Sequence, residues 1–447
     1  MDNLPSDILL DIFARLPDST DLASCRLTSH RLLSLSYQVS SISIQQHKHY
    51  NPIPFKARVT NLVSLLSSSL QSISISAKSD DHAVLGERDS GAVEIDEIND
   101  LTDFDFLSAW LPLVDRQLKS LSIDNCWSKY RAGFSSALSL ISDICNNLEN
   151  LVIRKAWLSF SCIKPMPTLT SLTLEFVTID DENLGKINEC LPYLQVLNMT
   201  RIIGLKEPKI HLLHLQACCF TGYPRSMTIH APNLTKLKLR CIEPSLLILK
   251  CPSLSEFNIS IVKPSGTIRM EIPKVLEKLT VKSLDIPQLL RFFKGTNKLR
   301  TLELEVSPIM SWFESYTIFS MSDILEMFGS IDELIFGPVA WYLWRRSFPP
   351  CPSISNRICS RKITVKLPPD DFNDIGLTSN VLKMCARSCQ VHLLFYSDVD
   401  EMQKADIIAK LLNSFPGVKW TWSTSEKLSI EFFNRLPQPH LYTSLQR

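Results

Sequence analysis

The chain of 447 residues contains little glycine, at 12 residues. Phosphate-binding loops and dinucleotide folds need glycine for turns with positive φ and for close approach of the backbone to a ligand. The scarcity of glycine therefore argues against those classes. The sequence also has no Gly-x-Ser-x-Gly, His-Glu-x-x-His or Gly-Lys-Ser/Thr motif, and no nucleophile paired with a base. We predict that the protein is not an enzyme and uses no cofactor.

An excess of charge and long apolar runs are missing as well. The formal net charge is +1, so no global field favours nucleic acid or a membrane surface as partner. No apolar run approaches the ~18 residues that a membrane span requires. The first residues, Met-Asp-Asn-Leu-Pro, lack the basic and apolar segments of a signal peptide.

The 13 cysteines are an odd number and are scattered along the chain, which fits a reducing compartment better than a disulfide scaffold. We expect a cytoplasmic or nuclear protein. Cys385, Cys389 and His392 offer three soft ligands, but a structural zinc site needs four and the fourth is not evident. We therefore predict no metal site.

What the sequence does contain is a short frame, repeated: leucine, two variable residues, leucine, one variable residue and another apolar residue. Nine copies begin at Leu118, Leu148, Leu169, Leu194, Ile210, Leu234, Leu254, Leu276 and Leu299. Successive starts lie 30, 21, 25, 16, 24, 20, 22 and 23 residues apart, which brackets the roughly 20–29 residue period of a leucine-rich repeat. A proline stands shortly before five of the copies, where it suits the first residue of a strand.

The alternation within the frame predicts a short strand with one buried and one wet face. Such a strand cannot bury its apolar face alone, so neighbouring repeats must supply a shared core. Weaker copies at 39–44 and 70–75 and a further one at 331–336 extend the array. The alternative is a set of ordinary amphipathic strands in a sandwich. Period and proline together favour an α/β solenoid with a curved leucine-rich-repeat array.

The first forty residues predict three short helices. Ser6 or Asp7 opens the first, which ends at Pro17. Asp18 is a candidate cap for the second, and Thr28 or Ser29 for the third. Helices this short are marginal alone, and a unit of about 40 residues usually needs a partner surface. A helical cap that protects the first repeat is the alternative interpretation.

The segment from Leu4 to Pro17, followed by Leu22 and Leu27, resembles an F-box, the helical module that docks on the SKP-type adaptor of a cullin ubiquitin ligase. The match is most specific at Leu4-Pro5, Ile12 and Leu16-Pro17, and position 31 lacks the aromatic residue that the family often has. The resemblance implies that ten residues bind the adaptor: Leu4, Pro5, Ile8, Leu9, Ile12, Phe13, Leu16, Pro17, Leu22 and Leu27.

An F-box followed by leucine-rich repeats is the order found in plant F-box/leucine-rich-repeat proteins. The resemblance implies a substrate receptor of the SCF class, with an SKP-type adaptor, a cullin and an unknown target protein as partners. We expect an F-box at 1–38, repeats at 39–346 and a C-terminal α/β cap at 347–447. The repeats include an acidic insertion at 78–105, expected to be mobile and solvated, with partner binding as the alternative. A helix is expected at 106–116.

The variable residues beside the last apolar position of each frame point away from the core, onto the concave side of such solenoids. Six basic residues follow these positions and the rim: Arg154, Lys236, Lys238, Arg240, Lys278 and Lys282. They could bind an acidic or phosphorylated partner, or they could be a merely solvated stripe. Two other functions remain open: a small-molecule or inositol-phosphate receptor, and a repeat scaffold unconnected to ubiquitin, with the N-terminal helices as a cap.

Overall fold

The structure, a computed structural model, describes residues 4–46, 54–77, 100–125, 134–264, 266–271, 273–306, 324, 327–328, 331–341, 361–367, 389–396 and 399–425. The chain divides into two compact units, residues 1–234 with 248–251 and residues 235–247 with 252–447. This division differs from the boundaries that we placed at residues 38 and 346, which stay predictions.

The first unit begins with the three short helices expected from the sequence, α1 (Ser6–Ala14), α2 (Ser19–Arg26) and α3 (His30–Ser36). Ser29 caps α3, since its side chain accepts a hydrogen bond from the backbone N–H of Leu32 at 3.1 Å. Asp18 stands at the cap position of α2, but its carboxylate bonds to the Thr20 hydroxyl at 2.7 Å and to no N–H of the helix.

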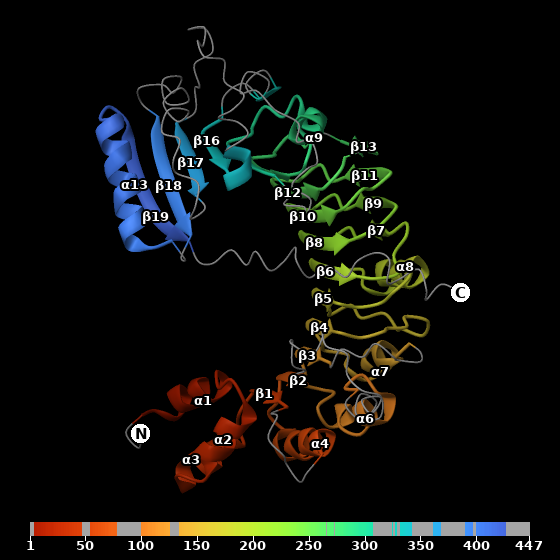
Figure 1. Ribbon diagram of the computed structural model, residues 1–447. Coiled ribbons are helices and arrows are strands. Elements are labelled where there is room, and N and C mark those ends of the chain that lie inside the picture. The colour runs from red at the N-terminus through yellow and green to blue at the C-terminus, as the bar shows by residue number, and fades with distance from the viewer. Residues whose placement is uncertain are drawn as a thin grey trace, which may run out of the picture. The chain divides into compact units, whose positions relative to one another are not determined.

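Parallel strands follow in the order of the sequence. They are β1 (Ser41–Gln45), β2 (Ser72–Ser76), β3 (Ser120–Asp124), β4 (Asn150–Arg154), β5 (Ser171–Glu175), β6 (Val196–Ile202) and β8 (Ala217–Gly222). The apolar frame positions are buried, as Leu121, Leu151 and Leu172 show with at most 1% exposure. In Figure 1 these strands lie side by side, with α4 (Phe55–Leu66), α7 (Ala137–Ile144) and α8 (Asp181–Cys190) on one side of them. The repeat prediction is confirmed for this unit.

One repeat was placed wrongly. The frame at Ile210 does not supply the strand of the main sheet; Lys209–His211 forms β7, which pairs in parallel with β9 (Ser226–His230) in a second sheet. The repeat starts instead at Leu215 and fills the next two apolar positions with Cys218 and Phe220, both buried. A buried cysteine packs as a small hydrophobe, so it can stand where the frame expects leucine.

The second unit repeats the same design. Its parallel strands, in the order of the sequence, are β10 (Lys236–Cys241), β12 (Glu256–Ile261), β14 (Lys278–Lys282), β15 (Thr301–Glu305), β16 (Glu333–Phe336), β17 (Lys362–Leu367), β18 (Gln390–Tyr396) and β19 (Lys419–Ser425). The described C-terminal strands thus continue the parallel sheet of the repeats. Figure 1 shows α13 (Glu401–Ser414) beside β18 and β19.

Two local expectations need correction. The helix expected at 106–116 is shorter and starts earlier: α6 spans Phe104–Ser108, and a separate 3-10 turn follows at Leu111–Leu113. Pro112 in that turn lacks an N–H donor and cannot continue an α-helix. The acidic insertion expected at 78–105 is anchored at its end: Leu101 is fully buried, and Asp103 caps α6 through the N–H of Phe106 at 3.1 Å. Residues 78–99 lie outside the described part of the chain.

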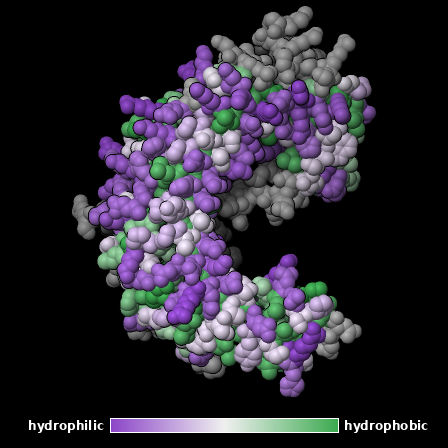
Figure 2. All heavy atoms as spheres, turned by 180° about the vertical axis from the view of Figure 1, so that it is seen from behind, coloured by the Kyte–Doolittle hydropathy of each residue, from purple (hydrophilic) through white to green (hydrophobic). Residues whose placement is uncertain are grey.

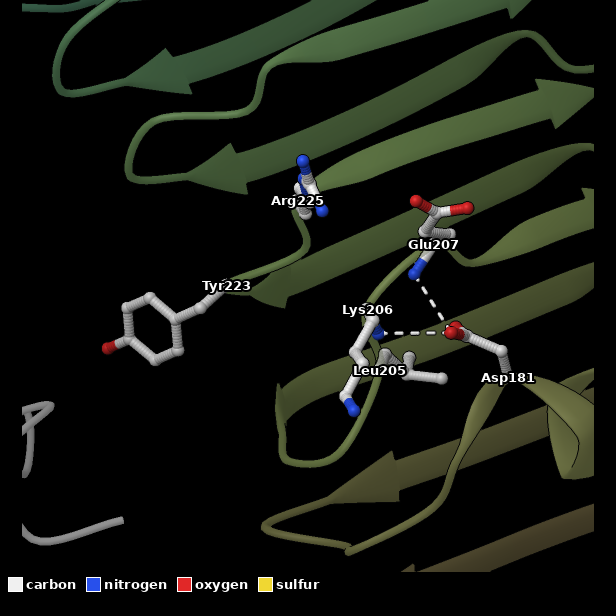
Figure 3. Close-up of a pocket in the computed structure, with 6 residues that line it drawn as sticks. All are labelled: Asp181, Leu205, Lys206, Glu207, Tyr223 and Arg225. Carbon is white, nitrogen blue, oxygen red and sulfur yellow. Dashed lines mark hydrogen bonds between the residues drawn. The ribbon is translucent and has the colours of Figure 1, made fainter. Parts of the chain in front are cut away.

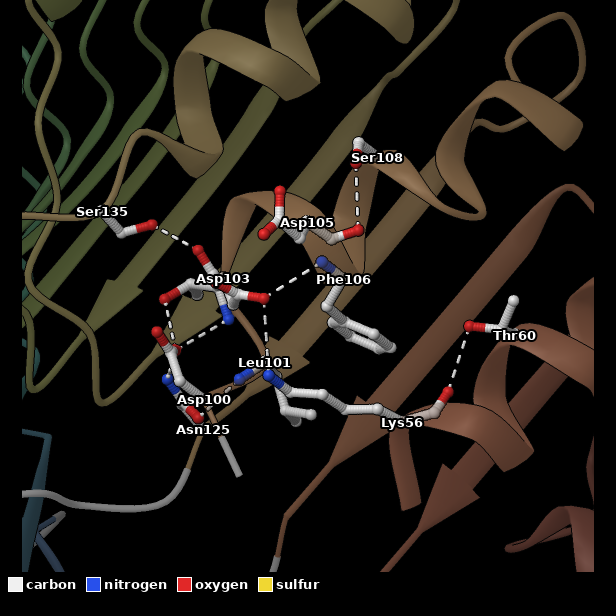
Figure 4. A network of polar contacts seen from close by, with 11 residues as sticks. Lys56, Thr60, Asp100, Leu101, Asp103, Asp105, Phe106, Ser108, Asn125 and Ser135 are labelled. Atoms are coloured by element: carbon white, nitrogen blue, oxygen red, sulfur yellow. Dashed lines mark hydrogen bonds and ion pairs between the residues drawn. The ribbon is translucent and has the colours of Figure 1, made fainter. Parts of the chain in front are cut away.

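A polar network holds this anchor in place (Figure 4). Asn125, buried after β3, donates to the carboxylate of Asp100 at 2.7 Å and accepts from the N–H of Leu101 at 3.1 Å. Lys56 of α4 forms an ion pair with Asp103 at 3.6 Å. A buried amide whose donor and acceptor are both used fixes the backbone on either side of it.

None of the helices in the described part of the chain has the length and apolar character that a membrane span requires.

Candidate functional site

The first candidate site is the outer surface of the N-terminal helices. Helix α1 carries two apolar faces. Leu9 and Phe13, at 2% and 4% exposure, face inward, and α1 contacts α3, on which Leu32 is also buried. Ile8 and Ile12, one turn apart, stay exposed at 47% and 39%. A helix in a lone globular domain needs only one apolar face, so the second indicates a surface that a partner covers.

The structure separates the ten predicted adaptor-binding residues into two groups. Leu9, Phe13 and Leu22 are buried within the module and hold it together, which leaves them out of reach of a partner. The exposed ones are Leu4, Pro5, Ile8, Ile12, Pro17 and Leu27, while Leu16 is half-buried. Leu27, at the end of α2, is 90% exposed. Figure 2 shows green, apolar spheres among purple ones on these helices.

Two polar ties stabilise the module. Arg31, at the position where the family often has an aromatic residue, donates from Nη2 to the backbone carbonyl of Leu4 at 2.6 Å and so joins α3 to the start of α1. Asp18 accepts the backbone N–H of Gln45 at 3.1 Å, and the Gln45 side chain donates to the carbonyl of Pro17 at 2.8 Å. The module is therefore fixed to strand β1, and both lie in the first unit.

The second candidate site is the face of the sheet opposite the buried leucines, here called the open face. In the first three strands this face carries hydroxyl groups in register: Ser41 beside Ser72 and Ser120, and Ser43 beside Ser74 and Ser122. In β8 the open-face residues include Cys219 and Thr221. Among the predicted basic residues, only Arg154 belongs to this unit, and Glu175 neutralises it at 3.0 Å.

The open face of the second unit is charged. Lys236 pairs with Glu256 at 3.2 Å, and Lys238 and Lys278 are exposed. Arg240 and Lys282 are half-buried and stand in register on either side of Ser260. The structure thus places five of the six predicted basic residues on one stretch of sheet, of which Lys236 is neutralised.

Two carboxylates, Glu303 and Glu305, lie beside this basic group. Glu303 accepts hydrogen bonds from Lys366, on β17, and from the Thr280 hydroxyl. Glu305 is register neighbour of Lys282 on the next strand. Burial raises the pKa of the Glu305 carboxyl and lowers the pKa of the Lys282 amine, and it is the largest cause of each of these two pKa shifts. Lys366 lies 63 residues from Glu303 in the chain, so only the fold reveals this contact.

A third feature is a hollow of about 340 Å³ in the first unit, lined by Asp181, Leu205, Lys206, Glu207, Tyr223 and Arg225 (Figure 3). One Asp181 oxygen accepts the N–H groups of Lys206 and Glu207 at 3.2 and 2.9 Å. In Figure 3 the side chains of Tyr223, Lys206 and Arg225 point apart. The converging basic and aromatic groups that a small-molecule receptor needs are therefore missing from this hollow.

Cysteine and metal chemistry find no support in the described residues. There, every cysteine is a free thiol, and no three His, Cys, Asp or Glu side chains come together as a metal site. Burial raises the pKa of Cys145 and of Cys241 to about 12, which keeps both thiols protonated and unreactive. Cys385, one of the three candidate zinc ligands, lies outside the described part.

Comparisons with known proteins agree with this architecture. Residues 1–41 match the F-box-like family. An F-box/LRR-repeat protein of Arabidopsis thaliana is 31% identical over 446 residues, covering 94% of this chain and 97% of that protein. The chain belongs to the plant F-box/leucine-rich-repeat proteins. The family and the fold inferred from the sequence are thereby confirmed, and the F-box supports a substrate-receptor role with an SKP-type adaptor as partner.

Proposed function

We propose that this chain is the substrate-recognition subunit of an SCF-type cullin ubiquitin ligase, acting in the cytoplasm or the nucleus. The N-terminal helices bind the SKP-type adaptor, and through it the cullin. The repeats hold a target protein whose lysines other subunits modify. In this proposal the chain works by binding and catalyses nothing itself.

The second apolar face of α1 is the observation that supports the proposal most directly. Leu4, Ile8 and Ile12 stand at intervals of four residues, and their exposure leaves apolar area uncovered on a module of about 40 residues. Burying such a side chain completely contributes about 1.5–3 kcal/mol. A few of them together supply a stable contact, in the manner of an apolar helix face laid in a groove.

Co-expression of the full chain with an SKP-type adaptor tests this interface. Ile8→Asp places an unpaired carboxylate in the apolar contact, so we expect adaptor affinity to fall by roughly tenfold or more. The matched control is Leu65→Asp on α4, because Leu65 has the same 47% exposure but lies outside the F-box. Equal co-purification of adaptor by wild type and Ile8→Asp would refute the proposal. Leu9→Asp is unsuitable, since Leu9 is core and its loss unfolds the module.

A second experiment identifies candidate target proteins. Proteins that accumulate in cells expressing Ile8→Asp, but not in cells expressing Leu65→Asp, are candidate targets of the ligase. A proteome identical in the two would contradict a role in degradation.

A further inference from the structure

Ser260 is an unusual residue on the open face of β12. The alternation of Phe257 and Ile259 into the core places Ser260 on the opposite side, yet it is only 5% exposed. Its Oγ is buried and has no hydrogen-bond partner among the described residues. Leaving a buried hydroxyl unsatisfied costs about 1–3 kcal/mol, so each such group calls for an explanation.

The surroundings of Ser260 are cationic. Arg240 on β10 and Lys282 on β14 are its register neighbours on the two sides. On β10, β12, β14 and β15 the open face carries basic Lys236, Lys238, Arg240, Lys278 and Lys282 and acidic Glu256, Glu303 and Glu305. Glu256 is used by Lys236, and Glu303 by Lys366 and Thr280. Glu305, on β15, is the register neighbour of Lys282.

We propose that Arg240, Ser260 and Lys282 form a subsite for a phosphate monoester, carried on a phosphorylated side chain of the target protein. The inference rests on the proposed function and specifies the chemistry of the target. A hydroxyl donor between two cations offers several hydrogen bonds to one tetrahedral dianion, whose three terminal oxygens accept them all. A carboxylate carries one charge and two acceptors, and Glu305 already presents such a group to Lys282, so a second carboxylate gains less there.

Titration of the purified full chain with inorganic phosphate, with sodium chloride at equal ionic strength as reference, tests the subsite. We expect saturable binding by calorimetry in the wild type, and roughly tenfold weaker binding in Arg240→Gln because a charge-assisted bond is lost. Lys236→Gln is the matched control: it removes a cation from the same strand and face, at a residue whose register neighbour is Glu256 and not Ser260. A wild-type response no larger than that to chloride, or an equal loss in both variants, overturns the proposal.

Substitution of Ser260 itself separates a ligand site from a structural role. Ser260→Ala should weaken phosphate binding about fivefold, the value of one neutral hydrogen bond. Ser260→Asp places an anion between the two cations, so it should abolish phosphate binding while the melting temperature is kept or raised. A site that is merely structural predicts the reverse, because a buried carboxylate then unfolds the chain. Loss of folding in Ser260→Asp, with phosphate binding unaltered in Ser260→Ala, would overturn the assignment.

Two further measurements fix the source of the phosphate and the independence of the two sites. A peptide containing phosphoserine should compete with inorganic phosphate, and the same peptide with serine should not; competition by both or by neither contradicts the proposal. Ile8→Asp should bind phosphate like the wild type. If Ile8→Asp retains the adaptor while Arg240→Gln loses phosphate, the proposed ligase role fails and the subsite stands.

Discussion

The two units have the same core and different open faces. In β1 to β3 the open face carries serine at Ser41, Ser43, Ser72, Ser74, Ser120 and Ser122. In β10 to β15 the open face carries lysine, arginine and glutamate interspersed with Asn258, Ser260, Thr280 and Thr301, several of them partly buried. The apolar positions are shared because stacking requires them. The open face is under no such constraint, so its residues can differ between the units.

Removal of a core phenylalanine in each unit tests the claim that the cores are equivalent and should have the largest effect. Phe220 and Phe257 are 0% and 1% exposed, and each fills an apolar position of a repeat. Phe220→Ala and Phe257→Ala should each lower the free energy of unfolding by about 3–5 kcal/mol, measured by urea denaturation. A nearly neutral result for either one would show that the units are not built alike.

Two glycine substitutions, one in each unit, should have a smaller effect on stability and test the packing around Glu305. A Cβ on Gly337 would overlap the carboxylate of Glu305 in the second unit, whereas a Cβ on Gly185 in α8 meets nothing within 4 Å. Gly337→Ala must displace a buried carboxylate from the N–H of Val306, and we expect a loss of about 1–3 kcal/mol. Gly185→Ala should instead gain up to about 1 kcal/mol, since alanine favours a helix interior. Thermal melts measure both; equal shifts would contradict the packing at Glu305.

The smallest expected effect is a dependence of stability on pH in the second unit. Burial raises the pKa of Glu305 above its unfolded value of about 4.3, so folding favours the protonated acid. Its contribution is fully present below that value and is lost as the pH rises through the raised pKa. The stability of wild type relative to Glu305→Gln should therefore fall between pH 4.3 and the raised pKa. Parallel curves in urea denaturation at several pH values would show that Glu305 is not desolvated.

Much of the fold could be predicted because the repeat frame is local. Leucine at fixed offsets signals each strand without knowledge of its neighbours, which is why most strands were located correctly. The failure at Ile210 has a physical cause, because Cys218 packs like leucine and β7 has the same alternation as a repeat strand. The 16-residue spacing from Leu194 was the available clue: starting at Leu215 restores 21 residues.

The candidate sites were harder to predict because they depend on contacts between distant residues. Sequence periodicity shows that α1 has two apolar faces, but not that Phe13 lies inside and Ile12 outside. The basic column was visible in the sequence, whereas the ion pair between Lys236 and Glu256 was not. Lys366 reaches Glu303 only because two repeats bring them together, and no local pattern marks Ser260 as buried.

The hydrogen bond from the N–H of Gln45 to Asp18 has a practical consequence for the design of truncated variants. Strand β1 pairs with β2 on one side, and helices α1 and α2 pack against it. An uncovered outer strand is a template for aggregation. Deleting the N-terminal helices would thus uncover β1 as well as remove the F-box. Insolubility of the truncated protein could then be mistaken for a loss of partner binding. Point changes on the outward side of α1 avoid that confusion.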